Sequence, residues 1–197
     1  MHCLIDLKKD SRNSTTGSLR IIAGEWRRRR IYFESSTELR PTTDAARETL
    51  FNWLQDRIEG TVCLDLFAGS GALGFEALSR GAGEVVFIDS NRLCIKSLHQ
   101  TSKELQTERC TIVHRNALDY LQRCNQKFDI VFLDPPYRSG LAAEALQKLD
   151  SMNCLNLDAR IYLEVERDFS SVKLADRWVI VRNFDAGSRS HYLLARQ

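Results

Sequence analysis

The feature that most constrains the fold is a regular alternation, from residue 61 onward, of short apolar runs and longer stretches with helical periodicity. The runs are apolar throughout rather than at every second position, which is typical of strands buried on both faces of a parallel sheet. They lie at 62–67, 84–88, 111–114, 128–133 and 160–165, and helical stretches at 72–80, 92–105, 117–123 and 141–149 separate them. The alternation predicts an α/β class domain, a doubly wound Rossmann-like sheet that is mostly parallel.

The two ends of the chain add elements of another kind. Strand candidates at 178–182 and 191–195 have no long helix between them, so we expect an antiparallel pair at one edge of the sheet. Short β-prone segments at 19–23 and 31–33 predict an N-terminal hairpin, and a helical pattern from Thr42 or Thr43 leads to Gly60. We therefore expect a disordered tail at 1–18, a hairpin with a lead-in helix at 19–60, and the α/β domain at 61–197.

Length and composition limit the class of protein. A chain of 197 residues with 43% hydrophobic and 27% charged residues is long enough for one such domain. No apolar run approaches the roughly 18 to 20 residues of a membrane span, and the N-terminus lacks the pattern of a secretory signal, which predicts a cytoplasmic protein. Six dispersed cysteines and four dispersed histidines predict reduced thiols and no metal. We expect a monomer, because no unpaired apolar surface pattern is evident.

A glycine-rich turn follows the first apolar run of the α/β region. Gly69, Gly71 and Gly74 fit the pattern G-x-G-x-x-G, and Asp89 closes the next strand about 20 residues on, where an acid can bind ribose. The glycines alone do not distinguish a dinucleotide site from a site for S-adenosylmethionine, because both bring a ligand close to bare backbone.

Asp65, at the end of the preceding strand, separates these alternatives. A buried carboxylate there would repel a pyrophosphate but would favour the ammonium and sulfonium groups of S-adenosylmethionine; a structural or capping carboxylate is the alternative. Asp65-x-Phe67-x-Gly69-x-Gly71 resembles the first motif of class I methyltransferases. The resemblance implies cofactor contacts for Phe67, for Asp89 and, at the adenine edge, for Asn116, which could equally be a plain helix cap.

A second motif, Asp134-Pro135-Pro136-Tyr137, follows the apolar run 128–133. Its prolines give a stiff turn at the edge of the sheet where open α/β sheets bind ligands. An exocyclic amino group of a nucleic-acid base is a poor nucleophile, so it needs acceptors that hold its hydrogens and aim its lone pair. The Asp134 carboxylate and the Pro135 carbonyl can serve as these acceptors, and Tyr137 offers a face on which the base can stack.

The arginines Arg27, Arg28, Arg29 and Arg30 are interleaved with aromatic residues in the predicted hairpin. Guanidinium groups bind phosphates and aromatic faces stack on bases, which is typical of RNA-contact surfaces. A solvated charged face is the alternative for this run taken alone, and the net charge of +2 does not decide the matter.

A longer resemblance covers about residues 19 to 196. It rests on Arg20-Ile21-Ile22-Ala23-Gly24, Leu39-Arg40-Pro41-Thr42, Arg47-Glu48, the glycine-rich block 67–81 and Asp134-Pro135-Pro136-Tyr137, all in one order and spacing. In these features the chain resembles the RsmD family, the bacterial-type 16S rRNA guanine-N2 methyltransferases.

The resemblance implies a seven-stranded sheet, S-adenosylmethionine as cofactor, and 16S rRNA in the small ribosomal subunit or its assembly intermediate as partner. It makes Arg20, Arg27 and Arg40 candidates for RNA contact, and it implies that Thr42 lies near the methionine end of the cofactor. Arg28 stands where the family often has glycine, which leaves the turn geometry of the hairpin open.

Three alternatives remain at this point. The residues themselves indicate an amino methyltransferase acting on a base, and only the resemblance implies guanine and 16S rRNA. An adenine-N6 or other base-amino methyltransferase on RNA or DNA is the first alternative. A nicotinamide-dependent oxidoreductase and a non-catalytic RNA-binding factor are the others.

Overall fold

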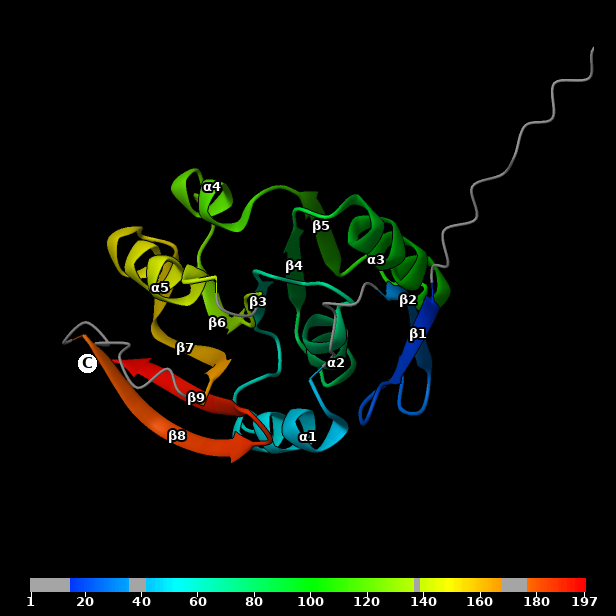
Figure 1. Cartoon of the computed structure of the whole chain (residues 1–197), viewed down its shortest axis with the longest axis horizontal. Coiled ribbons are helices and arrows are strands. Elements are labelled where there is room, and N and C mark those ends of the chain that lie inside the picture. Colours follow the sequence, from blue (N-terminus) through cyan, green and yellow to red (C-terminus); the bar gives the residue numbers. More distant parts are fainter. Residues whose placement is uncertain (1–14, 36–41, 137–138, 168–176) are drawn as a thin grey trace, which may run out of the picture.

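The computed structural model describes residues 15–35, 42–136, 139–167 and 177–197 (Figure 1). Its helices are α1 (Asp44–Trp53), α2 (Ala72–Ser79), α3 (Arg92–Leu105), α4 (Ala117–Gln122) and α5 (Leu141–Ser151). Its strands are β1 (Thr15–Arg20), β2 (Arg30–Ser35), β3 (Val62–Asp65), β4 (Glu84–Asp89), β5 (Cys110–His114), β6 (Phe128–Leu133), β7 (Leu155–Glu166), β8 (Trp178–Ala186) and β9 (Arg189–Arg196).

The main sheet has seven strands in the order β5-β4-β3-β6-β7-β9-β8. Strands β3 to β7 run parallel, whereas β9 is antiparallel to both β7 and β8. The predicted mostly parallel sheet with an antiparallel pair at one edge is confirmed. Because β3 has β4 on one side and β6 on the other, the chain order reverses there, and ligands of open α/β sheets bind at such a point, beyond the carboxyl ends of the strands.

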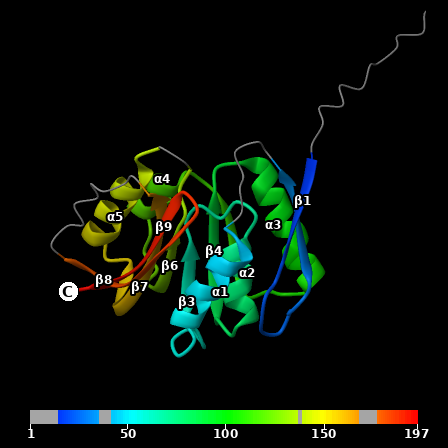
Figure 2. The ribbon, with the colours of Figure 1, turned by 60° about the horizontal axis from the view of Figure 1, so that its bottom comes forward.

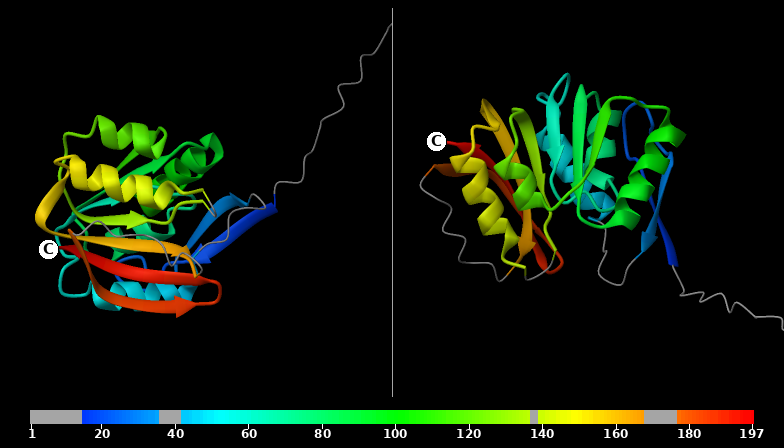
Figure 3. Two further views of the ribbon diagram at one scale, coloured as in Figure 1. Left: turned by 60° about the vertical axis from the view of Figure 1, so that its left-hand side comes forward. Right: turned by 90° about the horizontal axis from the view of Figure 1, so that it is seen from above.

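Two hydrophobic cores cover the two faces of this sheet (Figures 2 and 3). Helices α1, α2 and α3 and the β1–β2 hairpin contribute to the first core, and α4 and α5 contribute to the second. Along β4, Val85 and Phe87 belong to the first core and Val86 to the second. This double burial explains why the strands are apolar throughout.

The β1–β2 hairpin differs from the prediction at its N-terminal end. Its strands pair from Thr15 opposite Ser35 to Arg20 opposite Arg30, so residues 15–18 of the expected tail belong to a strand, and residues 21–29 form the connecting loop. A Cβ added at Gly17 would lie 2.6 Å from the Phe33 ring, so a glycine is needed beneath that ring. The polar stretch Thr-Gly-Ser carries no strand signal of its own, and its pairing with β2 is what makes it a strand.

A buried carboxylate on α2 fixes the hairpin loop to the domain. The backbone N–H groups of Ile22 and Ala23 donate to Glu76 at 2.8 and 3.1 Å, and Arg80 donates to the same carboxylate at 2.7 Å. The fully buried Arg47 of α1 lies 3.6 Å from Glu76 and donates to the Arg20 carbonyl at 2.8 Å. The loop is therefore held by charge-assisted hydrogen bonds rather than by apolar packing alone.

Helix α1 is shorter than its helical pattern suggested. Thr43 caps it by accepting a hydrogen bond from the Ala46 N–H, but it ends at Trp53, well before Gly60. Leu54 and Ile58 are buried although they lie in the turns that follow. Strands β7 and β8 are longer than predicted. The pairing of β8 with β9 continues to Ala186, and β7 begins at Leu155, which pairs with Phe128 of β6.

The outer strand β8 exposes three consecutive apolar side chains, Val179, Ile180 and Val181, at 45%, 45% and 36%. An apolar surface row is therefore present, and the reason given for expecting a monomer does not hold.

Cys63, Cys94 and Cys154 are buried free thiols, as predicted. Within the described ranges, no helix combines the length and apolarity that crossing a bilayer requires.

Candidate active site

A cleft of about 340 Å³ opens at the carboxyl ends of β3, β4 and β6. Nine of the residues predicted to bind cofactor or substrate amino group line it: Thr42, Asp65, Phe67, Gly69, Asp89, Asn116, Asp134, Pro135 and Pro136. They come from five separate stretches of the chain, and four of these lie at the ends of parallel strands, which meet at one edge of the sheet. Ser90, Asn91, Cys94, Leu141 and Arg189 also line the cleft and were not predicted.

Asp65 ends β3 with its side chain buried at the base of this cleft. It is 3% exposed, and its Oδ2 accepts a hydrogen bond of 3.0 Å from the Gly74 N–H. Burial, with the charge of Asp89 adding to it, raises the pKa of Asp65 to about 7, against the effect of the Gly74 hydrogen bond. A cation in the cleft would favour the charged form of Asp65, whereas a pyrophosphate would disfavour that form.

The glycine turn is shaped by Asp89 and by contacts behind it. The Gly69 N–H donates to Asp89 Oδ2 at 2.8 Å, and Asp89 Oδ1 accepts from the Asn91 N–H at 2.7 Å. Gly71 does not line the cleft; it precedes α2 with a φ of 78°, and a Cβ there would lie 2.6 Å from Leu98 and Phe75. Gly71 therefore permits the turn from strand to helix instead of approaching a ligand.

Asn116 is a helix cap that also lines the cleft. Its side-chain oxygen caps α4 by accepting hydrogen bonds from the N–H groups of Leu118 and Asp119, at 2.9 and 3.3 Å. The residue also lines the cleft, on the side of the β5 end. The cap fixes its orientation, so that one residue can start the helix and border a ligand.

Asp134-Pro135-Pro136 follows β6 directly and forms the opposite wall of the cleft. Asp65 pairs with Phe132 in the sheet, so the ends of β3 and β6 place Asp65 and Asp134 in the same cleft. The Asp134 side chain is 23% exposed. Burial raises the pKa of Asp134 to about 8, the charge of Glu164 adds to the rise, and Arg189 and Thr42 oppose it. Tyr137 lies outside the described residues.

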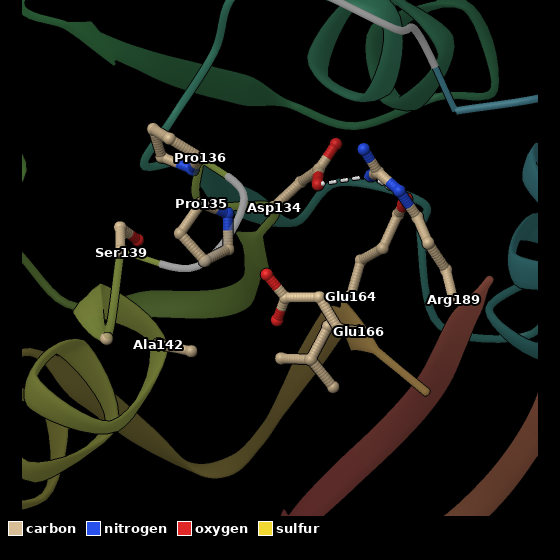
Figure 4. Close-up of a pocket in the computed structure, with 10 residues that line it drawn as sticks. Asp134, Pro135, Pro136, Ser139, Ala142, Glu164, Glu166 and Arg189 are labelled. Carbon is tan, nitrogen blue, oxygen red and sulfur yellow. Dashed lines mark hydrogen bonds and ion pairs between the residues drawn. The ribbon is translucent and has the colours of Figure 1, made fainter. Parts of the chain in front are cut away.

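Behind Asp134 lies a buried polar network that the sequence did not reveal (Figure 4). Arg189 Nη1 donates to Asp134 Oδ1 at 3.0 Å and also to Glu164 Oε1. The Thr42 hydroxyl lies 2.9 Å from Glu164 Oε2 and 3.3 Å from Asp134 Oδ2. Arginine and threonine thus link two carboxylates on different strands.

The network continues away from the cleft through Tyr162 and His191. The Tyr162 hydroxyl donates to Glu164 Oε2 at 3.0 Å and lies 2.7 Å from His191 Nδ1. Burial lowers the pKa of His191, so the neutral ring with hydrogen on Nδ1 completes a chain of donors that ends at Glu164. Glu164 is held by donors from three separate residues.

The arginines of the hairpin lie on its surface. Arg20, Arg27, Arg28, Arg29 and Arg30 are exposed, and Arg40 lies outside the described residues. Arg20 and Arg30, with Thr42, Thr43 and Asp44, line a groove of about 450 Å³ between the hairpin and the start of α1. Thr42 also belongs to the main cleft, so the groove and the cleft adjoin.

The turn that holds the arginine run has a left-handed residue. Arg28 has a φ of 72°, a conformation that favours glycine, and its N–H donates to the Ile21 carbonyl at 2.9 Å. The turn geometry that the Arg28 position left open is therefore a left-handed one, adopted here by an arginine.

The comparisons with known proteins show the family of the chain. The family model described as conserved hypothetical protein 95 matches residues 19–195. Ribosomal RNA small subunit methyltransferase D of Haemophilus influenzae is 40% identical over 194 residues, which is 95% of this chain and 98% of that protein. The protein of the same name from Escherichia coli K12 is 39% identical over 189 residues, 96% of each chain.

Solved structures show the same fold. The structure of yhhF from Escherichia coli has a TM-score of 0.84 and 38% identity, and covers 92% of this chain and 99% of that one. A Thermus thermophilus 16S rRNA N2 G1207 methyltransferase, solved with AdoMet and guanosine, shares the fold with a TM-score of 0.71 at 20% identity over 93% of this chain and 50% of that one. With its motifs, its sheet and its relatives in agreement, the chain belongs to the RsmD family of methyltransferases.

Proposed function

We propose that this protein transfers a methyl group from S-adenosylmethionine to the exocyclic 2-amino group of a guanine in 16S rRNA of the small ribosomal subunit. The observation that carries the proposal is one cleft with two different walls. Asp65 and Asp89 make one wall acidic, and Asp134 and Pro135 offer hydrogen-bond acceptors on the other. The names of the relatives from Haemophilus influenzae and Escherichia coli support rRNA of the small subunit as substrate.

The cleft fits the cofactor by charge and by shape. Its glycine turn gives close backbone approach, and the buried Asp65 suits a ligand that carries positive groups and no phosphate. Asp65 would bind the methionine part, Asp89 the ribose hydroxyls and Asn116 the adenine edge. When bound, S-adenosylmethionine supplies an electrophilic methyl group on a sulfonium.

The proline turn activates the amino group. Asp134 and the Pro135 carbonyl accept its two hydrogens and direct the nitrogen lone pair toward the methyl carbon. The N–C bond forms as the S–C bond breaks, the positive charge that develops on nitrogen is stabilised by the carboxylate, and one amino proton is released. The pKa of Asp134, raised to about 8 by burial and Glu164, makes its carboxylate a suitable acceptor for that proton near neutral pH.

RNA would reach the cleft along the hairpin. The groove lined by Arg20 and Arg30 adjoins the cleft at Thr42, and Arg27 to Arg30 extend the positive surface. Phosphates bound there would hold the RNA while the target base, unstacked from its neighbours, enters the cleft. The family relationship supports RNA contact for Arg40. Tyr137, in the proline turn, would offer its ring as a face on which the base stacks.

The test is nucleoside analysis after the reaction. Small subunits from a strain that lacks the endogenous methyl group are incubated with the protein and labelled S-adenosylmethionine, and the RNA is digested. The proposal predicts that the label appears as N2-methylguanosine. Label in N6-methyladenosine would instead support the adenine alternative, and no label in RNA would contradict RNA methylation altogether.

A further inference from the structure

The charges around Asp134 oppose the charged form of its carboxylate, which the proposed reaction requires. Glu164 on β7 and Asp65 on β3 are both negative neighbours, and they add to burial in raising the pKa of Asp134 to about 8. Glu166 of β7 lines the small pocket beside Asp134, and Asp89 acts on Asp65. A protonated Asp134 would offer only part of its acceptor capacity to an amino group.

Arg189 is the positive group that faces Asp134 among the described residues. It stands at the start of β9, and Nη1 contacts Asp134 Oδ1 and Glu164 Oε1 at once. Its side chain is 25% exposed, that of Glu164 is 1% exposed, and Arg189 also lines the main cleft. The cation is therefore anchored on a buried carboxylate and directed at the reactive one (Figure 4).

Glu164 is in turn held by the hydroxyl groups of Thr42 and Tyr162, with His191 behind Tyr162. The two hydroxyl groups donate hydrogen bonds to Glu164, whereas the His191 ring contacts the Tyr162 hydroxyl. An arrangement of donors around one carboxylate keeps the position of that carboxylate fixed.

We infer that Arg189 is a positioning residue of the methyl-transfer reaction: its guanidinium, anchored on Glu164, favours the charged form of the Asp134 carboxylate and turns that carboxylate toward the amino group. The inference rests on the proposed function, because it concerns the same reaction. It assigns opposite electrostatic effects to two residues in contact. Arg189 favours the charged form of Asp134, whereas the charge of Glu164 disfavours it.

The test compares single-turnover methyl transfer against pH for the parent, Arg189→Gln and Glu164→Gln. In the parent the rate should rise with pH as Asp134 loses its proton and then level off. An opposite charge at this distance typically lowers a carboxyl pKa by about 1 to 3 units, so Arg189→Gln should shift the rising limb upward by about one unit or more. It should therefore be about tenfold slower at neutral pH and approach the parent rate at high pH.

Glu164→Gln should shift the same limb to lower pH, since it removes a negative neighbour. Arg189→Lys retains the charge and should restore most of the parent profile. Arg196→Gln is the matched control, because Arg196 lies at the other end of β9 and contacts Asp150. Its profile should match that of the parent.

A purely structural role would lower the rate by one factor at every pH. If Arg189→Gln and Glu164→Gln both behave in that way, or if the Arg189→Gln limb coincides with that of the parent, the inference is wrong. If Arg189→Gln fails to fold, Arg189→Met, which keeps the aliphatic part of the side chain without the charge, takes its place in the same comparison.

A second readout needs no RNA. The carbon-13 signal of the Asp134 carboxyl carbon, assigned by its disappearance in Asp134→Asn, is titrated by NMR in the parent and both variants. A higher pKa in Arg189→Gln and a lower one in Glu164→Gln support the inference even if the proposed RNA substrate is wrong. Equal values in all three proteins overturn it, while absence of methyl transfer in the parent alone refutes only the proposed function.

Discussion

Replacing Asp65 with asparagine should stabilise the protein and weaken its cofactor site at the same time. Asp65 is 3% exposed, its Oδ2 accepts from the Gly74 N–H at 3.0 Å, and burial raises its pKa from the ordinary value of 3.8 to about 7. Asparagine has nearly the same shape and keeps an oxygen for the Gly74 N–H. The change therefore removes the charge while leaving the packing in place.

The magnitude follows from the rise in pKa. Each pKa unit corresponds to about 1.4 kcal/mol, so a rise from 3.8 to about 7 sets an upper limit of about 4 kcal/mol for the cost of the charged form in the folded protein. The cleft is open to solvent, which screens this cost, and we expect about 1 to 2 kcal/mol. Because the folded protein holds the proton more tightly than the unfolded chain, stability falls as pH rises from about 4 to about 7 and is then constant.

Urea unfolding of the cofactor-free protein at several pH values measures the effect. The unfolding free energy of Asp65→Asn should exceed that of the parent by an amount that grows from about pH 4 to about pH 7 and reaches about 1 to 2 kcal/mol. Calorimetric titration should show S-adenosylmethionine binding about tenfold or more weaker, because the cofactor no longer faces a negative charge there. Asp56→Asn, at an exposed aspartate after α1, is the control and should change neither quantity. Parallel stability curves for parent and Asp65→Asn would refute the reasoning.

Three further predictions concern the other parts of the site. Asp134→Ala should slow single-turnover methyl transfer by about 100-fold or more with unchanged cofactor affinity, and equal rates would exclude Asp134 from the chemistry. Replacing Arg27 to Arg30 with glutamine should weaken RNA binding. The slope of log affinity against log salt should become shallower by up to about 0.9 for each phosphate that the protein no longer neutralises. An unaltered slope would place the RNA-binding surface elsewhere. Glu76→Gln should lower the unfolding free energy by about 3 kcal/mol and increase hydrogen exchange in residues 20–30, since it removes the buried charge that faces Arg47 and Arg80 and accepts from the loop; Glu48→Gln, on an exposed position of α1, is the control, and unchanged exchange would contradict the anchoring role.

The part of the site that could be predicted from sequence lies at the ends of parallel strands. Asp65, Asp89 and Asp134 each close or follow an apolar run, and all such ends meet at one edge of a parallel sheet. Local order along the chain was therefore enough to bring these three carboxylates together. The same reasoning could not separate Gly71, which shapes the turn, from Gly69, which borders the cleft.

The network behind Asp134 could not be predicted, because it depends on the register of a long-range antiparallel pair. Glu164 lies opposite His191 and Glu166 opposite Arg189 where β7 meets β9. A shift of one residue would turn Arg189 to the other face of the sheet. No local pattern specifies that register. Glu164 lies in a segment that the sequence indicates only as a strand candidate, and Arg189 precedes the predicted strand 191–195.

The N-terminal end of the hairpin and its attachment to the domain could not be predicted either. Residues 15–18 pair with β2 without any strand signal of their own, and the loop is anchored by Glu76, more than 50 positions away in the chain. The β-prone segments 19–23 and 31–33 predicted that a hairpin exists, while its attachment to α2 depends on a buried charge whose partners are distant in sequence.

The central claim is that one cleft binds the methyl donor on its acidic wall and presents the methyl group to the proline turn. A crystal structure of the protein with S-adenosylmethionine tests it most directly. We predict a ligand whose amino acid part contacts Asp65, whose ribose contacts Asp89, and whose methyl group faces Asp134 and the Pro135 carbonyl. A donor bound away from Asp65 and Asp89, or with its methyl group turned away from Asp134, would contradict the account.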